Sequence, residues 1–159
     1  MPEFARMPRD LESALSGDGF RRRRRLVVPL LTADPEGFPR VALLTLGDVR
    51  AGSPSRIAIA VMAGSRTAFN LVRRGMATIL FLHRSVTASI QARAGRGRVC
   101  STDPRRRLFP LAVESVRLDR PAESEGDVAL LTGPTFTGRD AARLFSDELY
   151  AELGRIASA

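Results

Sequence analysis

The sequence contains no lysine, and all 25 of its basic residues are arginine, set against 17 acidic residues. It also lacks tryptophan and has a single tyrosine, so aromatic side chains on which nucleic-acid bases could stack are scarce. Codon bias explains a complete replacement of lysine by arginine more simply than a need for guanidinium groups at every site. The net charge of +8 is therefore only a weak argument for nucleic acid as a partner.

Cysteine, histidine and long apolar runs are also scarce. The single Cys100 excludes an internal disulfide, and no set of His, Cys, Asp and Glu residues has the spacing of a metal site. No apolar run approaches the roughly 20 residues of a membrane span, and the N-terminus does not look like a signal peptide. These absences predict a cytoplasmic protein without a membrane segment. The length of 159 residues suits one domain over residues 1–159.

Apolar runs separated by turn-forming residues predict a mainly β (α+β) protein. We expect six strands, at 26–32, 40–46, 57–62, 76–83, 86–99 and 111–118, with Gly95 and Gly97 marking a bend or bulge in the fifth. Helices are expected at about 8–17, 68–74 and 139–156. Segments 33–38 and 47–55 are interpreted as turns, 101–107 as a loop or short helical turn, and 121–138 as irregular. Hairpins with few long crossovers favour an antiparallel barrel.

The most informative local pattern is Gly64-Ser65-Arg66-Thr67, where an apolar strand ends and a short helix begins. The first amides of a helix have no intrahelical partner and lie at its positive dipole end. Together with the Ser65 hydroxyl and the Arg66 guanidinium they would suit a phosphate group. The alternative is that Ser65 is only a helix cap and Arg66 a solvated side chain.

The order of motifs around this turn resembles pyridoxamine 5′-phosphate oxidase and its relatives. An opening hairpin, TADPEGFPR at 32–40, leads into the strand RVALLT at 40–45. The strand IAIAVM at 57–62 is followed by GSRT, then AFNL and the apolar strand ATILF at 77–81. The resemblance covers about residues 26–99, with 111–118 as a further strand. It implies a six-stranded antiparallel split β-barrel with flanking helices.

The resemblance also implies a flavin site, with FMN as the expected cofactor and deazaflavin or haem as alternatives. Family members usually bind FMN at the interface of a homodimer, so a second subunit would contribute Ser89 or Gln91. Within one subunit the implied cofactor contacts come from the second strand, the end of the third strand and the turn that follows it. These contacts are Arg40, Val41, Ala42, Leu43, Thr45, Val61, Ser65, Arg66 and Thr67, of which the last three would hold the phosphate.

Several positions depart from the oxidase pattern. Thr45 and Thr67 stand where the oxidase has lysines, and Val61 stands where it has a hydroxyl-bearing side chain. The chain also lacks the C-terminal Arg-x-His segment that the oxidase uses on its substrate. We therefore expect flavin-dependent oxidation or reduction of another small organic molecule, with no assigned catalytic side chain. A non-catalytic flavin or haem carrier or sensor, or an arginine-rich nucleic-acid-binding barrel, are the alternatives.

The remaining conspicuous residues have simpler interpretations. His83 is the only histidine, and a structural role is favoured over a place in a substrate pocket. Cys100 is interpreted as buried and inert. The arginine runs 21–25 and 105–107 are interpreted as solvated segments rather than nucleic-acid contacts. One arginine of the second run would also be able to reach the flavin phosphate or an anionic substrate across a dimer.

Overall fold

The computed structural model describes residues 3–17, 25–83, 86–119, 133–137 and 145–159. Its strands form one antiparallel sheet in the order β3-β2-β6-β7-β9-β5-β4, with β1 and β8 each paired to β9. The strands are β1 Glu3–Phe4, β2 Val27–Ala33, β3 Pro39–Thr45, β4 Val49–Ser53, β5 Arg56–Met62, β6 Met76–His83, β7 Val86–Ala94, β8 Arg98–Val99 and β9 Arg106–Asp119. The helices of the described residues are α1 Arg9–Leu15, the 3₁₀ turn η1 Leu46–Asp48, α3 Arg66–Arg74 and α4 Asp147–Ser158.

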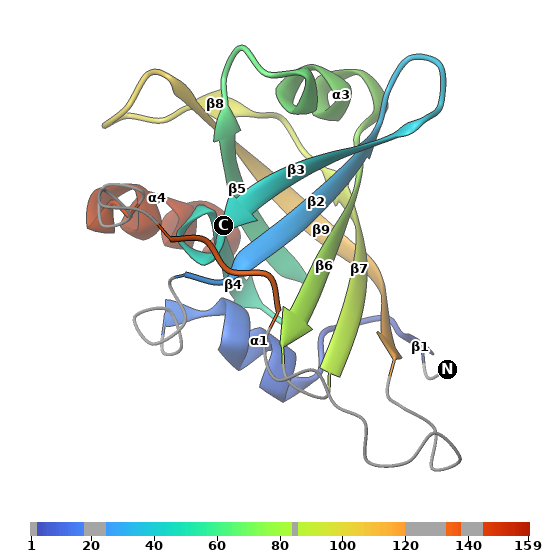
Figure 1. Cartoon of the computed structure of the whole chain (residues 1–159). Coiled ribbons are helices and arrows are strands. Elements are labelled where there is room, and N and C mark those ends of the chain that lie inside the picture. Colours follow the sequence, from blue (N-terminus) through green and yellow to red (C-terminus); the bar gives the residue numbers. More distant parts are fainter. Residues whose placement is uncertain (1–2, 18–24, 84–85, 120–132, 138–144) are drawn as a thin grey trace.

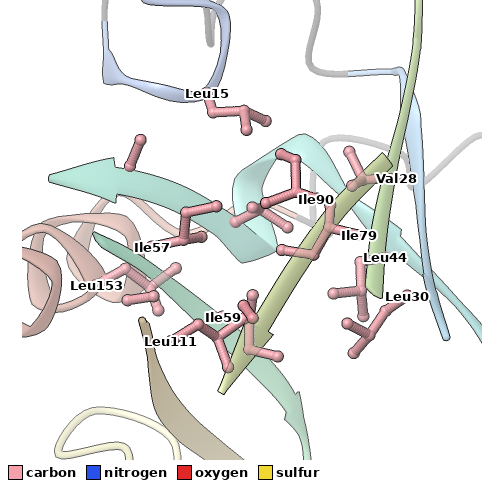
Figure 2. Packing of buried hydrophobic residues seen from close by; sticks show 14 of the residues in the cluster. Leu15, Val28, Leu30, Leu44, Ile57, Ile59, Ile79, Ile90, Leu111 and Leu153 are labelled. Atoms are coloured by element: carbon pink, nitrogen blue, oxygen red, sulfur yellow. The ribbon is translucent and has the colours of Figure 1, made fainter. Parts of the chain in front are cut away.

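The sheet curls into a split barrel, with α3 and α1 near opposite ends and α4 on the outside beside β4 (Figure 1). Alternating residues of β6 and β7 are buried, as expected for strands with one face in the core, whereas β5 is buried on both faces from Ile57 to Val61. Val28, Leu30, Ile59, Ile79 and Ile90 are all fully buried there (Figure 2). All six expected strands are present, which confirms the mainly β split-barrel prediction.

The expected turn at 47–55 is wrong, because this segment contains strand β4, which pairs with β5. Gly52 suggested a turn, but the reason for its glycine is a close contact with α4. A Cβ at Gly52 would lie 2.5 Å from the main-chain carbonyl group of Ala157. The glycine thus allows helix and strand to approach one another and does not end the strand.

The last expected strands need correction at their boundaries. The fifth divides into β7 and β8 around Gly95 and Gly97, which confirms a break at the two glycines. The sixth begins earlier than expected, because Arg106 and Arg107 belong to β9 and not to a loop. Helix α4 begins at Asp147, so residues 145 and 146 of the expected helix 139–156 precede it. The Ser146 hydroxyl caps α4 by accepting a hydrogen bond from the Leu149 amide at 3.2 Å. Residues 138–144 lie outside the described chain.

Helix α3 begins two residues before the expected 68–74 and ends where expected. Gly75 stops it in a left-handed conformation with φ of 62°. Helix α1 lies within the expected segment 8–17. No helix in the described part of the chain is long and apolar enough to cross a membrane.

Candidate functional site

The turn between β5 and α3 is fixed by hydrogen bonds on both sides. The Ser65 amide donates to the Met62 carbonyl at 3.0 Å, and the Ser65 hydroxyl accepts from the Ala68 amide at 3.1 Å. The Ala63 amide donates to the Arg105 carbonyl of the neighbouring loop at 2.7 Å. Ser65 is therefore an N-cap, as one interpretation of the sequence required.

The first residues of α3 keep free hydrogen-bond donors. The amides of Arg66 and Thr67 find no acceptor among the described residues. The Arg66 side chain is exposed and makes no hydrogen bond or ion pair with the described part of the chain. Free amides, a positive helix end and an unpaired guanidinium are groups with which proteins bind anions, and we call this set the anion-binding cradle.

The β2–β3 hairpin is tied to the other end of α3. The Asn70 amide group donates to the Thr32 hydroxyl at 3.0 Å, and the Arg74 guanidinium donates to the Asp34 carbonyl at 3.1 Å. The Arg40 guanidinium is paired with the Asp34 carboxylate at 3.1 Å and remains largely exposed. Helix and hairpin therefore form one unit, which fixes Arg40 relative to α3.

The Asp34 carboxylate is ionised and holds the Arg40 side chain. Burial alone would raise the pKa of Asp34, but the hydrogen bond from the Phe38 amide and the charge of Arg40 outweigh it, so the pKa is lowered. The Phe38 amide donates to this carboxylate at 2.8 Å. Arg40 therefore has a fixed anchor on one side and free N–H groups on the other.

Strand β3 is an edge strand whose outer face is apolar and open. Val41 is 60% exposed and Leu43 is 71% exposed. Ala42, between them, packs against the core. Two neighbouring large aliphatic side chains on an edge strand form a flat apolar wall that lacks a covering element within the described chain.

Two predicted contact residues have buried side chains. Thr45 is buried, and both its amide and its hydroxyl donate to the Asp48 carboxylate, at 3.0 and 3.1 Å. Val61 is also buried, in β5. A contact from Thr45, Val61 or Ala42 to a ligand on the outer face would have to come from main-chain atoms.

Ser89 and Gln91 lie on the same outer face as Val41 but three strands away. In the strand register, Gln91 is paired with Thr78, Thr78 with Leu31, and Leu31 with Val41. Paired residues of antiparallel strands point to the same side of the sheet. Gln91 also accepts a hydrogen bond from the Ser115 hydroxyl at 3.0 Å. This outer face, which we call the β3–β7 face, contains a hollow of about 440 Å³ that Thr78 and Gln91 help to line.

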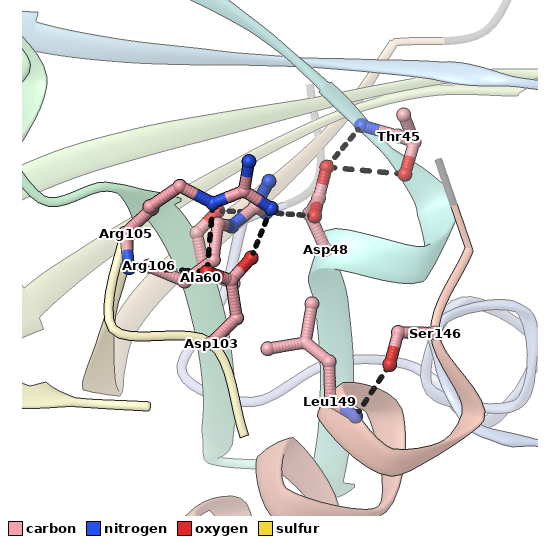
Figure 3. Close-up of polar contacts among 8 residues, drawn as sticks. All are labelled: Thr45, Asp48, Ala60, Asp103, Arg105, Arg106, Ser146 and Leu149. Atoms are coloured by element: carbon pink, nitrogen blue, oxygen red, sulfur yellow. Dashed lines mark hydrogen bonds and ion pairs between the residues drawn. The ribbon is translucent and has the colours of Figure 1, made fainter. Parts of the chain in front are cut away.

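The arginine run 105–107 is engaged within the molecule. Arg106 donates to the Asp48 carboxylate and to the Ala60 carbonyl, and so joins η1 to β5 (Figure 3). Arg105 is paired with Asp103 at 3.0 Å, and Arg107 lies 5.4 Å from the centre of the Phe109 ring. The pair of Arg106 with the buried Asp48 is not predictable from the sequence, where its only local signal is the isolated Asp48 between apolar residues.

The other conspicuous residues add no second site within the described chain. Cys100 is buried as expected and lies in hydrogen-bond contact with Glu152. His83 ends β6, and its side chain lies outside what the structure describes. Of the run 21–25, residues 21–24 also lie outside it. No group of three or more potential metal ligands is found among the described residues.

Comparison with known proteins finds similarity in structure. No family model and no curated sequence matches the chain. A candidate pyridoxamine 5′-phosphate oxidase from Lactobacillus delbrueckii aligns with a TM-score of 0.54 at 16% identity, over 74% of this chain and 99% of that one. An FMN-binding protein from Syntrophomonas wolfei aligns with a TM-score of 0.50 at 11% identity, over 71% and 91%.

An F420 reductase also aligns, with a TM-score of 0.51 at 8% identity, over 60% of this chain and 91% of that one. At such identities the likeness concerns the fold, and the fold is the one that the hairpin, strand and turn motifs of the sequence predicted. The chain therefore has the split β-barrel fold of the pyridoxamine 5′-phosphate oxidase-like proteins.

Proposed function

We propose that this protein binds FMN, with the flavin phosphate held at Ser65, Arg66 and Thr67. The observation that carries the proposal is the anion-binding cradle at the start of α3, with two free amides and an unpaired Arg66. Its setting supports a flavin phosphate over an unspecified anion, because structural neighbours with this fold include an FMN-binding protein and an F420 reductase.

The residues around the cradle fit the rest of such a cofactor. The exposed Val41 and Leu43 offer an apolar wall for the flat ring system, and Arg40, which precedes Val41 on β3, keeps free N–H groups. A bound flavin supplies hydride-transfer chemistry, to which the protein adds orientation and electrostatics. The chain's own residues would bind the phosphate, orient the ring along β3 and keep water from one side of it.

We further propose that the protein works as a homodimer whose copies meet through the β3–β7 face. This face combines the exposed Val41, Leu43 and Met76 with the hollow beside Gln91. In one copy Gln91 lies three strands away from β3, so a Ser89 or Gln91 contact to the flavin on β3 would have to come from the second copy. Sedimentation of the wild type and of Leu43→Glu tests this: the wild type should be dimeric and the variant monomeric and folded.

The activity that we propose is oxidation or reduction of a small organic substrate by the bound flavin. Thr45 and Thr67 stand at the two lysine positions of the oxidase, and the Thr45 side chain is bonded to Asp48. With fewer cations near the phosphate, Arg66 should carry a larger share of its binding energy. Reduction of the bound cofactor by a nicotinamide donor, and its reoxidation by a substrate, would separate an enzyme from a flavin carrier.

The test of the binding proposal is titration of the apoprotein with FMN, followed by flavin fluorescence. Arg66→Ala should weaken FMN binding about 10- to 100-fold, since a charged hydrogen bond contributes about 1.5–3 kcal/mol. Arg73→Ala is the matched control, because Arg73 is an exposed arginine in the last turn of the same helix. A wild type that takes up no FMN, or an Arg66→Ala protein that keeps full affinity, would refute the proposal.

The absorption spectrum of the protein as purified distinguishes the cofactors. A flavin spectrum supports the proposal, whereas a deazaflavin spectrum would favour the second candidate, an F420-dependent reductase. This candidate is motivated by the structural likeness to an F420 reductase. A haem spectrum would contradict both.

A further inference from the structure

The C-terminal helix carries a carboxylate that is almost completely buried. Glu152 of α4 is 3% exposed, and its side chain accepts from the Ser101 hydroxyl at 2.7 Å and the Ser101 amide at 3.1 Å. The Cys100 thiol donates to the same carboxylate at 3.3 Å, and the Arg98 guanidinium lies 3.5 Å away. A buried carboxylate is costly unless its oxygens are satisfied, and this one has four such neighbouring groups.

The Glu152 carboxyl is ionised at neutral pH. Burial alone would raise its pKa, but the hydrogen bonds from Ser101 and Cys100 and the charge of Arg98 outweigh burial and lower the pKa. The charged Glu152 carboxylate therefore joins helix α4 to the loop, because it accepts several hydrogen bonds from residues 100 and 101.

The loop that Glu152 holds is closed by its own hydrogen bonds. The Cys100 amide donates to the Arg106 carbonyl at 2.9 Å, and the Arg106 amide donates to the Asp103 carbonyl at 2.9 Å. The Asp103 carboxylate accepts from the Arg105 amide at 3.1 Å. Because these bonds span the whole of segment 100–106, which we call the clamp loop, it should move as one piece.

The far end of the clamp loop touches the anion-binding cradle. The Arg105 carbonyl accepts from the Ala63 amide at 2.7 Å, and Ala63 stands two residues before the N-cap Ser65. A path of hydrogen bonds and main-chain links therefore leads from Glu152 through Cys100 to Arg106, and from its neighbour Arg105 to the turn that presents Arg66. We propose that Glu152 is a positioning residue, which holds the phosphate-binding turn in place through the clamp loop. This inference rests on the proposed FMN site.

The competing explanation is that Glu152 only fastens α4 to the barrel. The helix already has other attachments, since Leu153 is fully buried and Ile156 is also in the core. In addition, the Arg50 guanidinium donates to the Tyr150 carbonyl at 2.8 Å. A purely structural role for Glu152 would lower stability and weaken every ligand alike. A positioning role would act on the phosphate group alone.

The test compares FMN with riboflavin, which has the same ring but no phosphate. The variants are Glu152→Ala and the milder Glu152→Gln, which keeps an oxygen that can accept from Ser101. Glu148→Gln is the matched control, because Glu148 is an exposed acid in the first turn of the same helix. We expect Glu152→Ala to weaken FMN about tenfold, the equivalent of roughly one charged hydrogen bond, and to leave riboflavin unchanged.

Each outcome of this comparison either supports the positioning role of Glu152 or overturns it. A selective loss for FMN, with partial recovery in Glu152→Gln, supports the positioning role. Equal losses for both ligands, or no loss for either, overturn it while FMN binding by the wild type still stands. If the wild type binds no FMN, the proposed function fails and this inference fails with it.

A second readout needs no ligand. Hydrogen exchange followed by NMR reports the protection of the Ala63 amide, whose acceptor is the Arg105 carbonyl. In Glu152→Gln this amide should exchange faster than in the wild type. Exchange of amides in the core strand β6 should change only as far as the global stability of the variant changes. Unchanged protection of Ala63 would overturn the proposed path.

Discussion

Two arginine-bearing regions lie side by side at one end of the barrel, and they differ in what their guanidinium groups do. At the start of α3, Arg66 is exposed and has no partner among the described residues. In the adjacent run 105–107, each arginine is engaged, Arg106 with the buried Asp48 above all. The more conspicuous sequence feature is therefore structural, and the less conspicuous one is available to a ligand.

The difference has a physical basis in burial. Arg106, whose side chain is only 21% exposed, must have its charge compensated, and the buried Asp48 does this across 58 positions of the sequence. An exposed arginine has no such need, and an exposed ion pair contributes little to stability. Within a chain without lysine, burial and pairing rather than residue type therefore separate the arginines that support the fold from those that can bind.

The largest effect should come from breaking the buried pair. Arg106→Ala leaves the Asp48 carboxylate buried without its charged partner, and we expect a loss of about 3–5 kcal/mol in the free energy of unfolding. Urea denaturation measures it. Arg105→Ala is the control, since Arg105 is 79% exposed and its pairing with Asp103 should contribute less than about 1 kcal/mol. Equal losses in the two variants would remove the distinction between buried and exposed arginines.

A smaller effect should follow from removing the helix cap. Ser65→Ala takes away the acceptor of the Ala68 amide and should cost about 1 kcal/mol of stability, measured by urea denaturation. Arg66→Ala should change stability by less than about 0.5 kcal/mol, as surface substitutions usually do. If Arg66→Ala were as destabilising as Ser65→Ala, Arg66 would have a structural partner and would not be a free ligand for an anion.

The smallest effect should appear on acidification. The folded pKa of Glu152 is lowered from its ordinary value of 4.5, so the unfolded chain takes up its proton at a higher pH than the folded chain. The stability that its charge contributes is therefore fully present above about pH 4.5 and is lost as the pH falls through the lower folded pKa. The difference in melting temperature between the wild type and Glu152→Gln should shrink over this interval. A difference in melting temperature that stays constant over this interval would contradict the lowered pKa of Glu152.

The sequence predicted those parts of the molecule that depend on local pattern. The six strands follow from runs of alternating or apolar residues, and the cap at Ser65 from a serine placed directly before a helical pattern. The order of these motifs was also enough to predict the split barrel. The contacts of Ser65 with Met62 and Ala68 lie within three residues, which explains why this turn was visible from the sequence.

The parts that were missed depend on contacts between distant segments. From the sequence alone Gly52 indicates a turn, because nothing in its sequence neighbourhood reveals the approach of Ala157. The sequence alone likewise predicts a loop at Arg106, because its partner Asp48 lies far away in the sequence. Family resemblance named Thr45 as a cofactor contact, and only the structure reveals that its side chain bonds to Asp48.

The most direct test of the account is the affinity of the wild-type protein for FMN relative to riboflavin, measured by calorimetric titration. In the proposed site the free amides of Arg66 and Thr67 and the Arg66 guanidinium bind the phosphate, which riboflavin lacks. We predict that FMN binds at least about tenfold more tightly than riboflavin, which corresponds to about 1.4 kcal/mol. Equal affinities for the two compounds, or no binding of either, would contradict it.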